Sequence, residues 1–68
     1  MITARYRVDG MTCEHCARAV TRAIEAAVPG ARVAVDLAAH RVSVTADATP
    51  DAIRRAVETA GYGFGGAA

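Results

Sequence analysis

Three segments of the chain alternate apolar and polar residues, which is the pattern of a strand with one buried face. In residues 2–9 the apolar positions are Ile2, Ala4, Tyr6 and Val8. Gly10 ends this segment. Residues 32–37 and 41–46 repeat the alternation around valines, and Ala38-Ala39-His40 between them predicts a hairpin loop. The pattern therefore predicts three strands, of which the last two are paired antiparallel.

Two further segments carry apolar residues at helical spacing. The first runs from Cys16 to Val28, with Thr12 as the expected N-cap and Pro29-Gly30 as its stop. The second follows Thr49-Pro50-Asp51, which supplies an N-cap, a first-turn proline and an early acidic residue. Its inward positions are Ile53, Ala56, Val57 and Ala60. Gly61 closes this second helix.

The order of these elements is βαββαβ, with a final strand expected after the second helix. Only Tyr62-Gly63-Phe64 remains for that strand before a run of glycine and alanine. We therefore expect the last strand to be short or frayed and residues 65–68 to form a flexible tail. Right-handed crossovers place both helices on one face of an antiparallel sheet. The sequence thus predicts an α+β, ferredoxin-like sandwich forming a single domain over residues 1–68.

The composition narrows the classes of function. The chain has 68 residues, of which 53% are hydrophobic, and a net charge of +1, so it can form one small core and has no field of a single sign. Its eight arginines are interleaved with acidic residues and it has only three aromatic side chains, which argues against nucleic-acid binding. Ser43 is the only serine and no glycine-rich phosphate loop precedes a helix. We expect a binding module and not an enzyme.

The first residues of the chain and its hydropathy indicate the cellular compartment. It carries no signal-peptide pattern, and no segment of the chain is apolar over the length needed to cross a bilayer. We therefore expect a cytoplasmic protein without membrane insertion, in a compartment where glutathione keeps unligated thiols reduced. The methionine at position 1 and the short end of the chain favour a complete gene product.

Both cysteines lie in Met11-Thr12-Cys13-Glu14-His15-Cys16, where the first strand gives way to the first helix. One thiol should lie in a loop and the other on the first helical turn, close enough to bind one ion together. Unpaired N–H groups and the helix dipole favour thiolates at such a place. Two thiolates with few other donors suit a soft monovalent metal such as Cu(I).

A Cys-x-x-Cys pair has other interpretations. Structural zinc usually takes four ligands, and this chain offers two cysteines and two histidines. A disulfide across two residues would constrain the unfolded chain very little. A thioredoxin-like redox pair normally lies in a larger βαβ unit. Metal binding is favoured over both redox chemistry and a structural role.

The sequence Gly-Met-Thr-Cys-Glu-His-Cys after a strand, with a second helix ending in Ala-Gly-Tyr, resembles the heavy-metal-associated domain. The resemblance covers residues 5–62 and includes the order of the elements. Members of this family include bacterial copper chaperones and the N-terminal modules of copper-transporting P-type ATPases. The resemblance implies that Cys13 and Cys16 hold Cu(I) in near-linear geometry. It also implies that the ion passes by thiolate exchange to a copper-transporting ATPase domain or a similar acceptor.

The resemblance assigns roles to residues near the two ligands. Met11 matches a methionine that points into the core and is not a ligand, and Tyr62 matches an aromatic position near the metal. Zinc-selective relatives tend to carry an acid where Thr12 stands, which counts against zinc. His15 lies between the ligands, where it would tune the thiolates or ligate in a dimer; an exposed position in water is the favoured expectation.

Several alternatives stay open at this point. The chain could be a carrier or sensor for another thiophilic ion such as Hg(II), Zn(II) or Cd(II), a metal-binding module excised from an ATPase, or a thiol-disulfide redox protein. Two-coordinate copper on an exposed loop leaves sulfurs able to bridge, so a copper-bridged homodimer is also expected. Arg18 and Arg22 are candidate contacts for an acidic partner surface.

Overall fold

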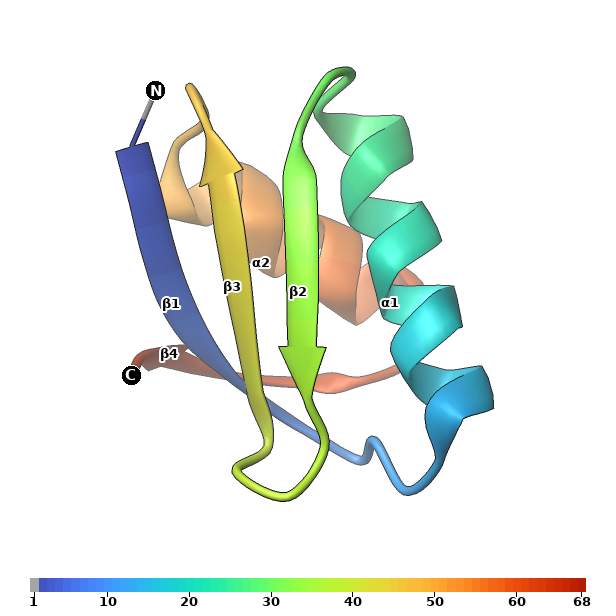
Figure 1. Cartoon of the computed structure of the whole chain (residues 1–68). Helices are drawn as coiled ribbons and strands as arrows, with labels where there is room; N and C mark the ends of the chain where they lie inside the picture. The colour runs from blue at the N-terminus through green and yellow to red at the C-terminus, as the bar shows by residue number, and fades with distance from the viewer. Residues whose placement is uncertain (1) are drawn as a thin grey trace.

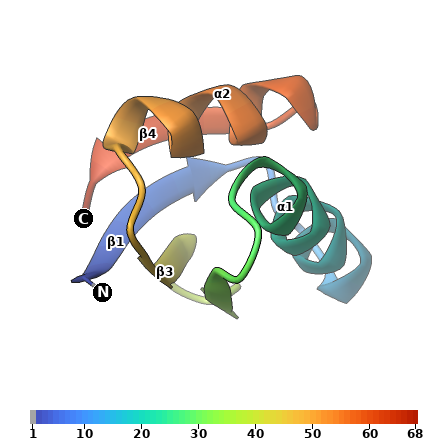
Figure 2. The same cartoon turned by 90° about the horizontal axis from the view of Figure 1, so that it is seen from above.

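Two helices cover one face of a four-stranded sheet in the computed structural model, which describes residues 2–68 (Figure 1). The elements are β1 (Ile2–Asp9), α1 (Glu14–Ala27), β2 (Arg32–Asp36), β3 (Arg41–Ala46), α2 (Pro50–Thr59) and β4 (Gly63–Ala67). The strand order is β2-β3-β1-β4, and every neighbouring pair is antiparallel. Seen from above, both helices lie on the same side of the sheet (Figure 2). The predicted ferredoxin-like βαββαβ sandwich is confirmed.

The alternation in the strands and the helical spacing meet in one core. The inward side chains of β1 and β3 pack against one face of each helix, as the sequence predicts. The largest fully buried side chains are Met11, Ile24, Ile53, Val8, Val20, Val42 and Val57. The opposite face of the sheet carries the polar residues of the alternating pattern and has no helix over it (Figure 2).

The last strand is longer than the three residues that the sequence leaves for it. β4 has five residues, and its pairing with β1 shifts register between Tyr6 and Val8. Residues 65–67, which the sequence indicates as part of a tail, therefore lie in the strand, and the flexibility of this end stays a prediction. Glycine is a poor strand former, but main-chain pairing with β1 extends β4 regardless of side chain.

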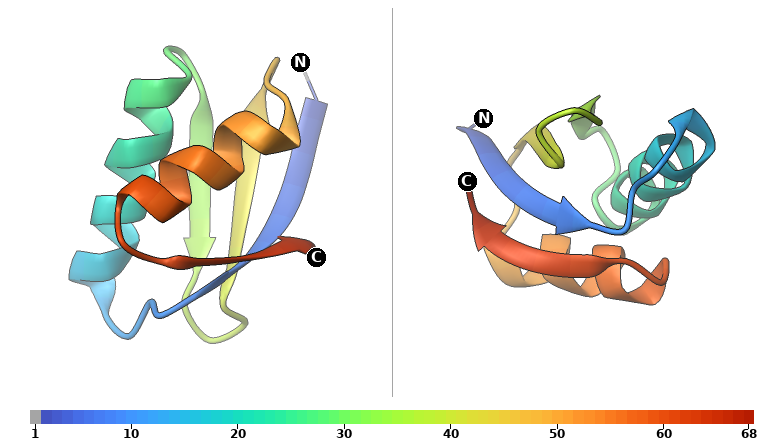
Figure 3. Two further views of the ribbon diagram at one scale, coloured as in Figure 1. Left: turned by 180° about the vertical axis from the view of Figure 1, so that it is seen from behind. Right: turned by 90° about the horizontal axis from the view of Figure 1, so that it is seen from below.

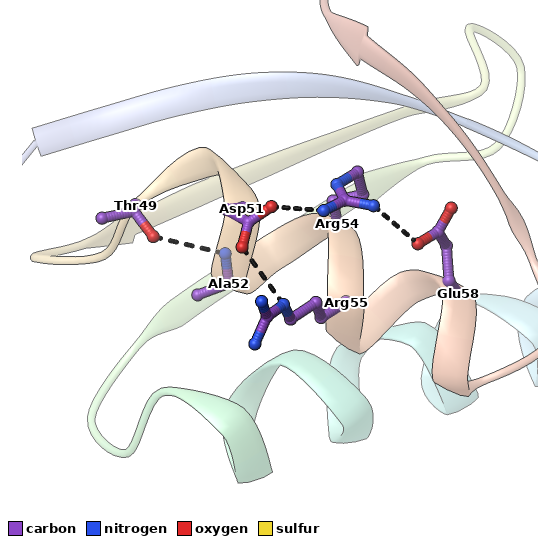
Figure 4. Close-up of polar contacts among 6 residues, drawn as sticks. All are labelled: Thr49, Asp51, Ala52, Arg54, Arg55 and Glu58. Carbon is purple, nitrogen blue, oxygen red and sulfur yellow. Dashed lines mark hydrogen bonds and ion pairs between the residues drawn. The ribbon is translucent and has the colours of Figure 1, made fainter.

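The start of α2 confirms its local sequence signal. The Thr49 hydroxyl accepts a hydrogen bond from the Ala52 N–H at 3.3 Å, and Pro50 occupies the first turn. Arg54 pairs with Asp51 and also donates to Glu58 at 3.2 Å (Figure 4). The Arg54 guanidinium holds the pKa of the Asp51 carboxyl below its usual value. These exposed pairs, one helical turn apart, stabilise α2 modestly.

The start of α1 corrects the sequence prediction. The N-cap is Cys13 and not Thr12, and no side chain makes a capping hydrogen bond there. The Cys13 backbone is extended, with φ −157° and ψ 173°, and its C=O accepts from the Ala17 N–H at 3.2 Å. With Thr12 as the cap, α1 would begin at Cys13; it begins at Glu14 instead, and the residue at the capping position carries a thiol.

The connection between β1 and α1 lies at the same end of the sheet as the β2–β3 hairpin (Figure 3). The Val8 N–H donates to the His40 C=O at 2.9 Å, which ties the end of β1 to that hairpin. None of the helices within residues 2–68 has the length and apolar character to span a bilayer. Met1, on which the expectation of a complete gene product partly depends, lies outside the described residues.

Candidate metal site

Cys13 immediately precedes α1 and Cys16 lies in its first turn, at one end of the molecule. Cys13 is the exposed N-cap, and Cys16 is partly buried in the first turn. Their sulfurs are 3.8 Å apart and both thiols are free. The predicted arrangement of one thiol in a loop and one on the helix is therefore present in the structure.

The sulfur separation suits a single shared ion. A metal–sulfur bond is about 2.3 Å for zinc, so two sulfurs bound to one ion can lie up to roughly 4.6 Å apart. At 3.8 Å both Sγ atoms can reach the same ion without movement of the backbone. A fully linear S–metal–S arrangement requires the sulfurs to separate by a little under an ångström, which rotation of the exposed Cys13 side chain can supply.

Among residues 2–68, Cys13 and Cys16 are the two side chains placed to donate sulfur to one metal ion. Within residues 2–68 no group of three or more cysteine, histidine, aspartate or glutamate side chains is arranged to hold a metal. His15 is exposed beside the pair, and His40 lies on the hairpin with a positive φ of 52°. A pair of this kind would suit an ion that accepts two ligands, or one whose coordination a second molecule completes.

Tyr62 immediately precedes β4 and lies beside residues 10–16, the metal loop. The Tyr62 hydroxyl is directed toward the Cys16 sulfur and is the largest reason that the pKa of Cys16 falls to about 6. A backbone hydrogen bond from Thr12 lowers the pKa of Cys16 further, with smaller contributions from the Cys13 and Thr12 side chains. Burial acts in the opposite direction. Cys16 is therefore largely a thiolate at neutral pH.

The same contact acts on Tyr62. The interaction with Cys16 raises the pKa of the Tyr62 phenol, and burial and the charges of Cys16 and Cys13 add to the effect. The phenol therefore keeps its proton at neutral pH and remains a hydrogen-bond donor to the sulfur. This places Tyr62 beside the loop, where the sequence resemblance puts an aromatic residue.

Gly10 is a positioning residue that the sequence pattern shows only as the end of a strand. Its φ of +96° is unfavourable for other residues, and a Cβ on it would lie 3.4 Å from Cδ1 of the Tyr62 ring. The turn at Gly10 thus brings the metal loop against Tyr62. Sequence motifs cannot identify this contact, because Gly10 and Tyr62 are far apart in the chain.

Met11 lies where the resemblance expects it, whereas Thr12 flanks the cysteines without capping the helix. Met11 is 1% exposed and belongs to the hydrophobic core beneath the loop. The Thr12 hydroxyl lies 3.9 Å from the Cys16 sulfur, at the outer limit of a hydrogen bond to sulfur. Met11 therefore supports the loop from below, and Thr12 flanks the thiolate at the surface.

Comparison with known proteins agrees with this arrangement. The family model of the heavy-metal-associated domain matches residues 5–63. Two copper-transporting ATPases of Rhizobium meliloti (strain 1021), numbered 2 and 1, are 44% and 45% identical over 64 and 60 residues. These matches cover 90% and 84% of this chain but 8% and 7% of the ATPases. The chain thus spans under a tenth of the length of those relatives.

Solved structures of copper chaperones share the fold over most of their length. Copper chaperone Atx1 from Synechocystis PCC6803 has a TM-score of 0.83 at 33% identity, covering 88% of this chain and 95% of that one. The CopZ metallochaperone has a TM-score of 0.86 at 30% identity, covering 93% and 98%. A sulfur pair at the start of a helix, an aromatic residue beside it and these matches lead to one conclusion: the chain belongs to the heavy-metal-associated domain family.

Proposed function

We propose that this chain binds Cu(I) through Cys13 and Cys16 and passes it to an acceptor by thiolate exchange. The single observation that carries the proposal is the pair of free sulfurs 3.8 Å apart at the exposed start of α1. Soft thiolate ligands select soft ions, and Cu(I) tolerates a coordination number as low as two. The copper-related names of the relatives support copper over other thiophilic ions.

Exposure of the site is what allows transfer. A thiolate of the acceptor attacks the bound ion and forms a third Cu–S bond. One Cu–S bond to Cys13 or Cys16 then breaks, and the second follows as a second acceptor thiolate binds. Neither copper nor sulfur changes oxidation state, and the ion is never free. The bond to exposed Cys13 should break first, because Cys13 is free to move, whereas Cys16 is partly buried beside Tyr62.

The acceptor that fits this scheme is the metal-binding domain of a copper-transporting P-type ATPase or a similar two-thiolate site. Arg18 and Arg22 lie exposed on α1, which begins at the metal loop, and would contact an acidic surface on that acceptor. Such contacts would orient the two sites and raise the rate of encounter, with a strong dependence on salt.

Competitive titration tests the choice of metal. Reduced protein is titrated with Cu(I), Zn(II) and Hg(II), each against a chelator of known affinity for that ion. The proposal predicts one Cu(I) per chain, held against a strong Cu(I) chelator, and much weaker Zn(II) binding because two thiolates leave zinc short of ligands. Preferential retention of zinc, or tighter retention of Hg(II) with negligible Cu(I) binding, would overturn it.

A second candidate is that the sequence functions as a metal-binding module of a larger copper-transporting ATPase. The observation that favours it is the higher identity to the two ATPases, 44% and 45%, than to the Atx1 chaperone at 33%. An antibody against the chain, used on an extract of the source cells, distinguishes the two. A free carrier gives a band near 7.0 kDa, whereas a module gives one at the size of a membrane transporter.

A further inference from the structure

Strand β2 forms a free edge of the sheet. The strand order β2-β3-β1-β4 leaves the outer side of β2 without a strand partner among residues 2–68. Alternate N–H and C=O groups of an edge strand face outward and can pair with another strand. The other edge, β4, shifts register and contains Gly66 at φ +87°, whereas β2 pairs with β3 in unbroken register over all five residues. β2 is therefore the regular edge.

The apolar side of β2 is incompletely covered. Val33 and Val35 point to the helix side of the sheet but stay partly exposed. Their partners on β3, Val44 and Val42, are 3% and 0% exposed. The core thus ends under β2 with apolar surface that a neighbouring strand would cover.

The sequence of β2 is complementary to itself when it is read antiparallel. The strand is Arg32-Val33-Ala34-Val35-Asp36. A two-fold axis at Ala34 puts Arg32 opposite Asp36 of a second copy, and Val33 opposite Val35. Each charge then faces its opposite, each valine faces a valine, and alanine faces alanine. Cross-strand pairs of these kinds stabilise antiparallel sheets.

The flank of α1 beside this edge carries small residues. Ala23, Ala26 and Ala27 line the groove toward α2, so the opposite flank, with Ala17 and Thr21, lies on the side of β2. The Thr21 hydroxyl is already bonded to the Ala17 C=O at 2.8 Å. Nearest the sheet these small side chains leave room beside β2, and the exposed Glu14 and Glu25 of the same flank lie farther out.

We propose that two copies of this chain pair through antiparallel β2 strands, forming a continuous eight-stranded sheet. The register is the one centred on Ala34, with two symmetric Arg32–Asp36 pairs. The pairing requires no metal and uses a face distinct from Cys13 and Cys16, so it does not depend on the proposed function. One edge strand and one helix flank bury a small area, which makes the dimer weak and reversible.

Exchange of charges tests the register directly. Arg32→Asp places Asp opposite Asp at both symmetric positions, and Asp36→Arg places Arg opposite Arg. Each variant alone should lose self-association by about tenfold or more, because two attractive pairs become repulsive. An equimolar mixture of the two variants restores opposite charges at both positions and should pair about as well as the natural chain.

Sedimentation velocity measures this on reduced protein with a metal chelator, across a concentration series reaching about 1 mM, the range where weak interfaces populate. Arg5→Asp, an equal charge change at an exposed position of β1, which β3 separates from β2, serves as the control and should dimerise like the natural chain. Circular dichroism checks that each variant folds, since the Ala39 N–H donates to the Asp36 carboxylate at 3.2 Å in the hairpin. A natural chain that stays monomeric throughout, or a folded mixture that stays monomeric while the natural chain dimerises, would overturn the proposal.

Discussion

At the scale of single residues, the site depends on a contact between two distant parts of the chain. Tyr62 follows α2, whereas Cys16 lies in the first turn of α1, and the fold brings the phenol to the sulfur. Gly10 makes this approach feasible through a positive φ that places the loop against the ring. In the proposed site the two cysteines are the ligands, and the Tyr62 phenol is the largest cause that lowers the pKa of Cys16.

Replacing Tyr62 with Phe should raise the pKa of the Cys16 thiol from about 6 toward the ordinary cysteine value, because the largest stabilising contact with the thiolate is lost. The rate of alkylation against pH, measured on the apo protein, reads this directly. Folding lowers the pKa of Cys16, so the Cys16 thiolate contributes fully to stability at pH values above the pKa of this thiol in the unfolded chain. That contribution is lost as pH falls through about 6. A Tyr62→Phe profile identical to the natural one would show that the phenol has no role.

Met11→Leu should leave Cu(I) affinity almost unchanged. Met11 is 1% exposed within the core, and a swap that keeps side-chain volume costs less than ~1.5 kcal/mol of stability. Competition with a Cu(I) chelator and thermal unfolding measure the two quantities. A fall in affinity by orders of magnitude, with loss of a sulfur from the copper X-ray absorption spectrum, would instead identify Met11 as a ligand.

At the scale of the elements, the two helices begin in different ways. α2 has a threonine whose hydroxyl caps it, whereas α1 has a cysteine at the cap with no capping side-chain hydrogen bond. Sulfur is a weak acceptor, so α1 begins less favourably than a serine or threonine cap would allow. Its free N–H groups and positive dipole end face the thiolates instead.

The two threonines form a matched pair for testing this difference. Thr49→Ala should lower the free energy of unfolding by about 1 kcal/mol, since the Ala52 N–H loses its acceptor. Thr12→Ala should cost much less, because Thr12 is not the cap of α1. Chemical denaturation compares the two variants under the same conditions. Equal losses of stability would mean that Thr12 supports the helix start in a way the structure does not contain.

The sequence predicts local signals well and distant contacts poorly. The Thr49-Pro50 helix start and the three alternating strands follow from neighbouring residues, and both are confirmed. The Thr12 cap is wrong, because the choice between adjacent residues depends on where the backbone leaves the extended conformation. The length of β4 depends on pairing with β1, which its own glycines do not reveal. The contact of Gly10 with Tyr62 is set by the whole fold.

At the scale of the whole molecule, the proposed metal site and the regular sheet edge at β2 are separate surfaces. Two cysteine ligands would leave room on a bound ion for ligands from a second molecule, which would serve transfer and also permit bridging. Copper-dependent and metal-independent association should therefore occur on different surfaces and respond to different reagents.

Less than one equivalent of Cu(I) should promote dimers that join through the face of Cys13 and Cys16, at protein concentrations too low for pairing through β2. Excess glutathione should return the monomer by supplying competing thiolate ligands. Sedimentation of apo and copper-loaded protein, with and without glutathione, measures both effects. Copper-loaded protein that remains monomeric without competing thiol would exclude the bridged dimer and leave a monomeric carrier.

The most direct test of the central claim is Cu(I) affinity after removal of one sulfur. Cys13→Ser and Cys16→Ser should each abolish tight binding in competition with a Cu(I) chelator. The fold should stay intact because Cys13 is exposed and Cys16 is only partly buried at the edge of the core, so a serine of similar size fits either position. Circular dichroism and thermal unfolding provide the control for folding. Each variant should be a folded protein that no longer retains Cu(I); near-natural affinity in either single variant would rule out the two-thiolate site.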